Sequence, residues 1–315
     1  MEAANPWKNT AAMQAAPLGA AFSPLIEVVG RELAADAPNR RSGPGAHVRA
    51  AGKIDANVEL MTESPFAAVL VDELASSSSI CHHCYLDVDE AGGESCCCGA
   101  CYGAWYCSEP CRAAALPVHG DSAAGAKDGE CSTLKRLRGS FDNTRDARLL
   151  CRIQHVRSTL VAAPGGEPAS GMSFADLVFH EEAEAAADGE DTVRSTAAET
   201  VALANSILPP TLAVISEAEG VNAVLRIRAN GFSVLDQGGG GAGIGVYLAG
   251  AYYNHSCVPN VCVTYAPPHT TPSQYDLKRM GTGRFACDHD TDKITTACAD
   301  RNRGNQLVFR TITRF

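Results

Sequence analysis

Short apolar or alternating runs lie towards both ends of the chain and predict β-strands. They are rich in Val, Ile, Leu and Phe and are bounded by Gly, Pro or Ser, as strands usually are. In the last run every second residue shares one face of the predicted strand: Leu307, Phe309, Thr311, Thr313 and Phe315. The predicted strands cover residues 24–29, 69–71, 232–235, 244–248, 261–265 and 307–315.

The middle of the chain follows a helical period instead. Leu149, Ile153, Val156 and Leu160 recur at three- and four-residue steps, which predicts an amphipathic helix. Four arginines at other positions of this helix are expected to face solvent: Arg145, Arg148, Arg152 and Arg157. Further helices are predicted over residues 174–187, 192–208 and 211–227, the second of them ending at a Pro-Pro pair.

The composition indicates a globular protein and argues against two classes of function. Hydrophobic residues make up 45% of the 315 residues, but no apolar run approaches the ~20 residues that span a bilayer. The net charge of −10 leaves no basic footprint for wholesale nucleic-acid binding. An acidic surface would instead suit a basic peptide partner.

Nine of the 14 cysteines lie between Cys81 and Cys131, and their spacing indicates metal binding. A disulfide scaffold is normally short and secreted, whereas these cysteines are paired inside a long chain. The spacings Cys81-x2-Cys84 and Cys98-x2-Cys101 each place two thiolates at a tight turn, close enough to share one tetrahedral zinc ion. A zinc ion would also stabilise a segment that has little apolar core of its own.

Four more residues complete a set of eight ligands, enough for two closed sites. Cys107 and Cys111 are four residues apart, so they face one way in the first turn of a helix. His119 and Cys131 supply the remaining two donors, an imidazole and a thiolate that zinc accepts.

Alternatives to this ligand set remain open. Cys96 and Cys97 compete with the neighbouring Cys98, although only Cys98 gives the x2 spacing to Cys101. His82 and His83 could also be ligands, but beside two well-spaced cysteines they are expected to face solvent. A different interpretation of the whole block is a set of free buried thiols.

The run from Cys98 to Cys111 resembles a MYND zinc finger, a family that binds two zinc ions through ligands in interleaved order. The resemblance implies that one ion binds Cys81, Cys84, Cys107 and Cys111, and that the other binds Cys98, Cys101, His119 and Cys131. Cys131 is the weakest assignment, because the family usually has only a few residues between its last two ligands.

A second motif lies further along the chain. Residues 254–260 read Asn-His-Ser-Cys-Val-Pro-Asn and follow the strand predicted at 244–248, and they resemble the signature of SET-domain lysine methyltransferases. Together with the finger, the motif makes the chain similar to the SET-and-MYND family, whose SET domain is split by an inserted finger. Residues 43–45 (Gly-Pro-Gly) resemble the family's Gly-x-Gly loop, and residues 228–232 its Asn-x-Phe element.

The resemblance implies an α+β fold, in which a β-rich SET domain is split by the MYND finger and by a helical insert. The predicted parts are a disordered leader over 1–23, the first part of the SET domain over 24–77, the finger over 78–132, the helical insert over 133–228 and the second part of the SET domain over 229–315.

The implied reaction is methyl transfer from S-adenosylmethionine to a lysine of a histone or another protein, in the nucleus or the cytoplasm. Positioning of the lysine behind the methyl group would supply much of the rate. In the family, the residues matching Asn254 and His255 contact the adenosine, and the one matching Asn230 reaches the cofactor by its side chain. Gly43 and Gly45 would lie against the methionyl end.

No residue of this chain can be assigned the role of the family's catalytic tyrosine. That tyrosine follows the last core strand, and Tyr252, Tyr253 and Tyr265 do not match its position. We therefore expect a chain truncated at its C-terminus. The alternative function is a catalytically inactive scaffold whose finger binds proline-rich peptides.

Overall fold

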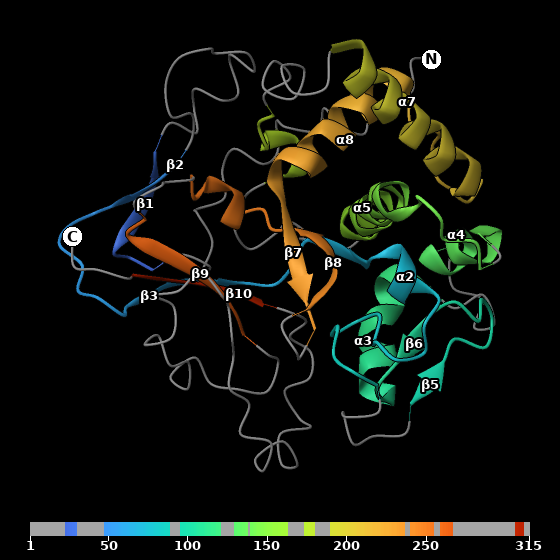
Figure 1. The fold of residues 1–315 in the computed structure, drawn as a ribbon, viewed down its shortest axis with the longest axis horizontal. Helices are drawn as coiled ribbons and strands as arrows, with labels where there is room; N and C mark the ends of the chain where they lie inside the picture. The colour runs from blue at the N-terminus through green and yellow to red at the C-terminus, as the bar shows by residue number, and fades with distance from the viewer. Residues whose placement is uncertain are drawn as a thin grey trace.

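A computed structural model of the chain gives the fold (Figure 1). The described residues are 23–29, 47–88, 95–120, 129–137, 139–162, 173–179, 190–236, 240–254, 259–266 and 306–311. The predicted leader up to residue 22, together with Gly43, Gly45 and His255, lies outside these ranges. The described elements combine helices with small sheets, so the α+β class is confirmed.

One three-stranded antiparallel sheet joins the early part of the chain to its last strand. Its order is β3 (Glu59–Glu63), β10 (Gln306–Thr311) and β9 (Val261–Ala266). Two residues that the sequence places on one face of the last strand, Phe309 and Thr311, are both 0% exposed, whereas residues 312–315 of the prediction lie outside the described ranges. Thr311 is satisfied in the core because its hydroxyl donates to the Asp55 carbonyl and accepts from the amide of Val58.

A second three-stranded sheet is built in the same way. Its order is β4 (Ala67–Leu70), β8 (Gly241–Val246) and β7 (Gly231–Leu235), with antiparallel neighbours. Strand β4 is buried along its whole length, which explains its continuous apolar sequence. Gly243 is required opposite β4, because a Cβ there would clash with the carbonyl oxygen of Val69. In both sheets, strands that precede the cysteine block therefore pair with strands that follow the helices.

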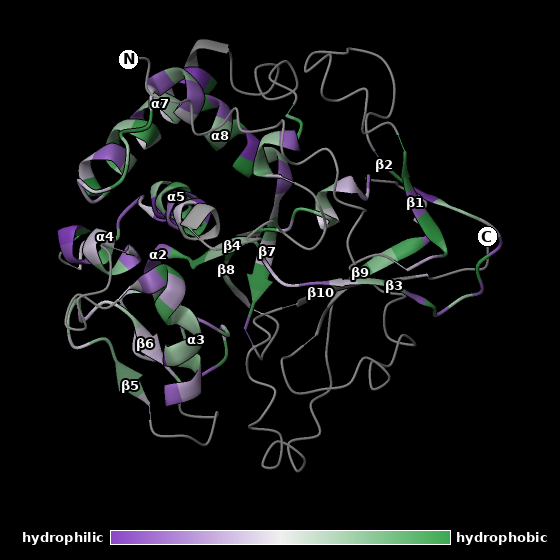
Figure 2. Cartoon of the chain, turned by 180° about the vertical axis from the view of Figure 1, so that it is seen from behind, coloured by the Kyte–Doolittle hydropathy of each residue, from purple (hydrophilic) through white to green (hydrophobic). Residues whose placement is uncertain are grey.

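A third pair of strands lies at the N-terminal side. Strand β1 (Ile26–Val29) pairs with β2 (His47–Ala50) in antiparallel register. Figure 2 shows β1 and β9 as mostly hydrophobic, whereas the helices carry hydrophilic and hydrophobic residues in turn. Glu27 and Arg49 lie directly opposite each other in this pair and form a surface ion pair, 2.6 Å apart.

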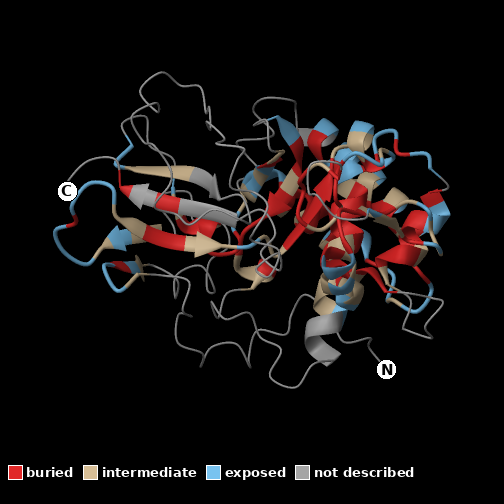
Figure 3. Ribbon diagram, turned by 90° about the horizontal axis from the view of Figure 1, so that it is seen from below, coloured by how far each residue is buried: buried red, intermediate tan, exposed pale blue. Residues whose placement is uncertain are grey.

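Three long helices lie on one side of the second sheet, and α5 (Arg145–Ala162) is the one that packs on it directly (Figure 1). Helix α5 packs on β4 and also contacts α7 (Glu190–Ile207), which in turn packs on α8 (Glu217–Asn230). The approach of α7 and α8 is close, since a Cβ on Gly220 would lie 2.5 Å from Val201 Cγ2. Figure 3 shows the buried residues concentrated in this helical half and along the strands.

Two helix predictions need correction. The helix predicted over 174–187 begins instead as a single 3-10 turn, η3 (Phe174–Asp176), and Leu177 is already extended; residues 180–187 lie outside the described ranges. The predicted helix 211–227 begins only at Glu217, because the segment before it is held by a side chain. Asn205 on α7 donates to the carbonyl of Ile215 and accepts from its amide, at 2.8 and 2.9 Å.

The cysteine block forms a small compact unit. It contains β5 (Cys96–Cys97), β6 (Trp105–Tyr106), α3 (Glu109–His119) and α4 (Glu130–Leu137), and it follows the short helix α2 (Asp72–Ala75). Strands β5 and β6 pair with each other and with nothing else in the described ranges. The boundary predicted between residues 132 and 133 falls inside α4.

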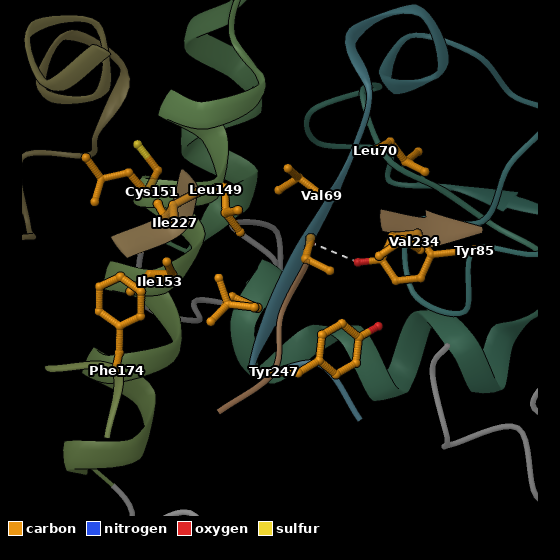
Figure 4. Packing of buried hydrophobic residues seen from close by; sticks show 14 of the residues in the cluster. Val69, Leu70, Tyr85, Leu149, Cys151, Ile153, Phe174, Ile227, Val234 and Tyr247 are labelled. Atoms are coloured by element: carbon orange, nitrogen blue, oxygen red, sulfur yellow. Dashed lines mark hydrogen bonds between the residues drawn. The ribbon is translucent and has the colours of Figure 1, made fainter. Parts of the chain in front are cut away.

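A continuous core joins this unit to the helices and the second sheet (Figure 4). Tyr85, from the cysteine block, is 2% exposed and donates its hydroxyl to the carbonyl of Ala68 on β4, at 2.8 Å. Leu149 and Ile153 of α5 are fully buried in the same core, as their spacing predicts. The hydrogen bond from Tyr85 to β4 therefore anchors the cysteine unit on the second sheet.

Two candidate metal centres

Each Cys-x2-Cys turn closes in the same way. The amide of Tyr85 donates to the carbonyl of Cys81, and the amide of Tyr102 donates to that of Cys98. Both tyrosines have positive φ, 62° and 53°, where the chain turns back after the second cysteine of the pair. This turn aims both thiols of a pair to one side, which is what a shared metal ion requires.

Helix α3 supplies one ligand at each of its ends. The Ser108 hydroxyl caps the helix by accepting from the amide of Cys111, 3.4 Å away, with a proline in the first turn. Cys107 precedes this cap and lies outside the helix, so the prediction that it belongs to the first turn is wrong, although its Sγ still lies 3.5 Å from that of Cys111. His119 is the last residue of the helix and is 3% exposed.

The first cluster contains Cys81, Cys84, Cys107 and Cys111, all buried. Its Sγ atoms lie close without being bonded: 3.6 Å from Cys84 to Cys107 and 3.5 Å from Cys107 to Cys111. Four thiolates around a zinc ion at ~2.3 Å have tetrahedral edges of about 3.8 Å. The sulfur positions are thus near those of a filled site.

The second cluster contains Cys98, Cys101, His119 and Cys131. Here Cys98 Sγ and Cys131 Sγ are 3.8 Å apart, and Cys101 Sγ is 3.7 Å from Nε2 of His119. In each cluster all four donor atoms lie within 4.8 Å of one another. The eight residues meet in the two interleaved sets that the resemblance implies, Cys131 included.

Each cluster contains thiols of lowered pKa beside thiols of raised pKa: hydrogen bonding with Cys107 raises the pKa of Cys84 and Cys111, and hydrogen bonding with Cys131 raises that of Cys101. Hydrogen bonds from Cys111, Cys81 and Cys84 hold the pKa of Cys107 far below its ordinary value. Hydrogen bonding from Cys101, against the opposing effect of burial, lowers the pKa of Cys131 to about 4. Thiolate and imidazole donors in sets of four are the ligands of structural zinc. The two clusters could hold metal ions, and zinc fits their donors.

The neighbouring candidates stay outside the clusters. Cys96 and Cys97 are half-buried free thiols that belong to neither group of four donors. The prediction that His82 and His83 face solvent is wrong, because both Nε2 atoms are buried. Burial lowers the pKa of His82 to about 3 and that of His83 to about 4, so both rings are neutral.

Of the residues predicted for a methyl-donor site, the structure describes Asn230 and Asn254. Asn230 ends α8 and donates its side-chain amide to the carbonyls of Val178 and Arg226, both at 2.9 Å. Asn254 is exposed and follows η4 (Gly250–Tyr252). Residue 231 pairs with 246 in the β7–β8 ladder, so Asn230 and the segment after β8 leave the sheet at the same end.

Glu63 is a residue of this region that the sequence analysis missed. Its carboxylate accepts from the amides of Ala249 and Gly250, at 2.9 and 2.7 Å, and so fixes η4 just before residues 254–260. Burial, opposed by these hydrogen bonds, raises the pKa of Glu63 to about 7. Its partners lie far along the chain, so no local pattern marks it.

The raised pKa of Glu63 predicts a pH-dependent stability. The folded protein binds the proton more tightly than the unfolded chain, so the stabilisation is complete below pH 4.5 and is lost as the pH rises to about 7. Glu63→Gln keeps the neutral form at every pH. Its stability relative to the native protein should therefore rise by about 3 kcal/mol between pH 4.5 and 8. Urea unfolding across this range measures the difference, with the exposed Glu27→Gln as control; a constant difference would contradict the argument.

Two of the four arginines of α5 that were predicted to face solvent do not. Arg148 and Arg152 are buried rather than solvated, with 5% and 14% of their side chains exposed. Arg148 donates to the carbonyl of Leu70 and to Asp72, at 2.8 and 2.7 Å. Arg152 donates to both carboxylate oxygens of Glu130.

Comparisons with known proteins identify no relative of this chain. No protein-family model matches the chain, and no curated protein matches it in sequence. None of the helices in the described ranges is both long and apolar enough to cross a bilayer. The class of the protein is therefore assigned from the chemistry of the site: it has two clusters of four Cys or His donors, a donor set that fits zinc.

Proposed function

We propose that the chain is a SET-and-MYND-type protein that binds two zinc ions and transfers methyl groups from S-adenosylmethionine to protein lysines. The observation that carries the proposal is the position of the two interleaved clusters inside a split β-region. Strands β3 and β4 precede the cysteines, and their partners β10 and β8 follow the helices. A cysteine unit inserted into one β-region is the organisation that the sequence resemblance implies.

The zinc ions have a structural role in this proposal. Each cluster has four protein donors, which leaves no open position for a substrate. Zinc would hold the turns at Cys81 and Cys98 and both ends of α3, in a unit whose strands β5 and β6 are two residues long each. The unit would then hold Tyr85 in place, and the hydroxyl of Tyr85 donates a hydrogen bond to β4.

The methyl-donor site is proposed at the end of the β7–β8 ladder. Asn230 precedes β7 at that end, the segment that leads to Asn254 follows β8 there, and the carboxylate of Glu63 fixes this segment at η4. Gly43, Gly45 and His255 complete the proposed set from outside the described ranges. Bound S-adenosylmethionine would supply the methyl group, and these residues would hold and orient it.

Calorimetric titration with S-adenosylmethionine tests this site. We expect saturable binding to the native chain and about tenfold weaker binding to Asn230→Ala, the loss of roughly one hydrogen bond to a charged ligand. Asn222→Ala changes the same residue type on the same helix and should bind like the native protein. No heat of binding to zinc-loaded, folded protein would contradict the proposal.

A peptide-binding scaffold is the second candidate. Tyr102, in the second cysteine turn, is 76% exposed, and exposed aromatic side chains form the grooves that bind proline-rich peptides. If binding is the function, Tyr102→Ala should abolish capture of a proline-rich peptide while the zinc content stays unchanged. Binding of such a peptide together with no binding of S-adenosylmethionine would favour the scaffold.

A further inference from the structure

The second cluster is in contact with a buried carboxylate that no ligand set includes. His119 directs Nε2 towards Cys101 and Nδ1 towards Glu130, whose Oε2 lies 3.5 Å away. Nδ1 is buried and has no hydrogen-bond partner among the described residues, so Glu130 is the polar group that faces it. A histidine that binds a metal through one nitrogen usually donates its other N–H to a carboxylate, a carbonyl or a water. Glu130 is placed to be that acceptor.

Glu130 is itself held from the other side. It is 8% exposed and lies in the first turn of α4, immediately before the ligand Cys131. Arg152 Nη1 donates to both of its carboxylate oxygens, at 2.8 and 2.7 Å. A buried carboxylate without such a partner would be strongly unfavourable. The arginine therefore keeps the charged acceptor beside His119.

Arg152 belongs to α5, the helix that packs on β4. One helical turn earlier on the same helix, Arg148 bonds the Leu70 carbonyl at the end of β4. Helix α5 is thus attached at two successive turns. Arg148 holds it to β4 of the second sheet, and Arg152 links it through Glu130 to His119. The apolar side chains of α5 lie in the hydrophobic core.

We propose that Glu130 is a positioning residue for the metal ion of the second cluster, and that Arg152 transmits the occupancy of that site to helix α5. The inference rests on the proposed zinc sites but not on methyl transfer. Glu130 would hold His119 as the tautomer with its proton on Nδ1, leaving the Nε2 lone pair for the metal. Loss of such an acceptor typically weakens metal binding by about 10–100-fold.

Competition with a chromogenic chelator tests the first part. In Glu130→Gln, one of the two zinc ions should bind about tenfold or more weakly, and the other should be unchanged. Cobalt substitution identifies the weakened site, because a site of three sulfurs and one nitrogen differs in its visible spectrum from a site of four sulfurs. Glu109→Gln, an exposed change on α3, should retain both affinities. Equal affinities in Glu130→Gln and Glu109→Gln would overturn the proposal.

Hydrogen exchange tests the second part. In the native protein, removal of the second ion should speed amide exchange in residues 145–158 of α5. In Arg152→Met, removal of zinc should no longer change amide exchange in α5. In Arg152→Lys, which keeps the positive charge, part of this zinc dependence should return. Zinc-independent exchange in the native protein would overturn the inference alone, whereas a native protein that binds no zinc would overturn the proposed function as well.

Discussion

Cys107→Ser is expected to reduce the zinc content from two ions per chain to one or none and to unfold the cysteine unit. Cys107 lies 3.6 Å from Cys84 and 3.5 Å from Cys111, so its loss opens the first cluster at its centre. Structural zinc contributes about 10–16 kcal/mol to the folding of small finger peptides. Because α3 carries ligands of both clusters, the second ion should also bind more weakly.

Zinc analysis and limited proteolysis measure this effect. The variant should be cleaved within residues 81–120 under conditions in which the native protein resists cleavage, and a strong chelator should produce the same pattern in the native protein. Cys97→Ser is the matched control, since Cys97 is a half-buried thiol outside both clusters. A Cys107→Ser protein that keeps two ions would contradict the assignment of the first cluster.

Arg148→Met should lower the free energy of unfolding by about 3 kcal/mol or more, the usual cost of breaking a buried ion pair by removing one partner. The guanidinium holds Asp72 and the carbonyl of Leu70, and it also donates to the hydroxyl of Thr144, at 3.0 Å. Methionine keeps most of the volume, so the loss measures the polar contacts rather than a cavity.

Denaturation by urea in the presence of zinc measures this change. Arg145→Met is the control on the same helix, since Arg145 is 44% exposed and pairs only with the neighbouring Asp146 in the described ranges. That variant should change stability by less than about 1 kcal/mol, as surface ion pairs usually do. Equal losses in the two variants would contradict the structural role of Arg148.

The sequence predicts well those features that depend on local spacing. The x2 pairs at Cys81 and Cys98 and the four-residue step at Cys107 are visible in the chain, because metal geometry imposes them locally. The grouping of the eight ligands into two sets came from resemblance to a family, since spacing alone allows other partners. Most strands were predicted for a similar reason: their period and their bounding residues are local.

The buried charges could not be predicted in this way. Arg148 and Arg152 lie off the apolar stripe of α5, which normally means exposure to solvent. Their partners Asp72 and Glu130 come from other elements, and only the tertiary fold brings them together. The same holds for Glu63, whose hydrogen-bond partners follow β8.

X-ray absorption at the zinc edge of the purified protein tests the central claim most directly. The two clusters contain seven cysteines and one histidine. The account therefore predicts two zinc ions per chain, with sulfur at ~2.3 Å and a small nitrogen contribution at ~2.0–2.1 Å. A coordination shell dominated by oxygen, or fewer than two ions in the folded protein, would contradict it.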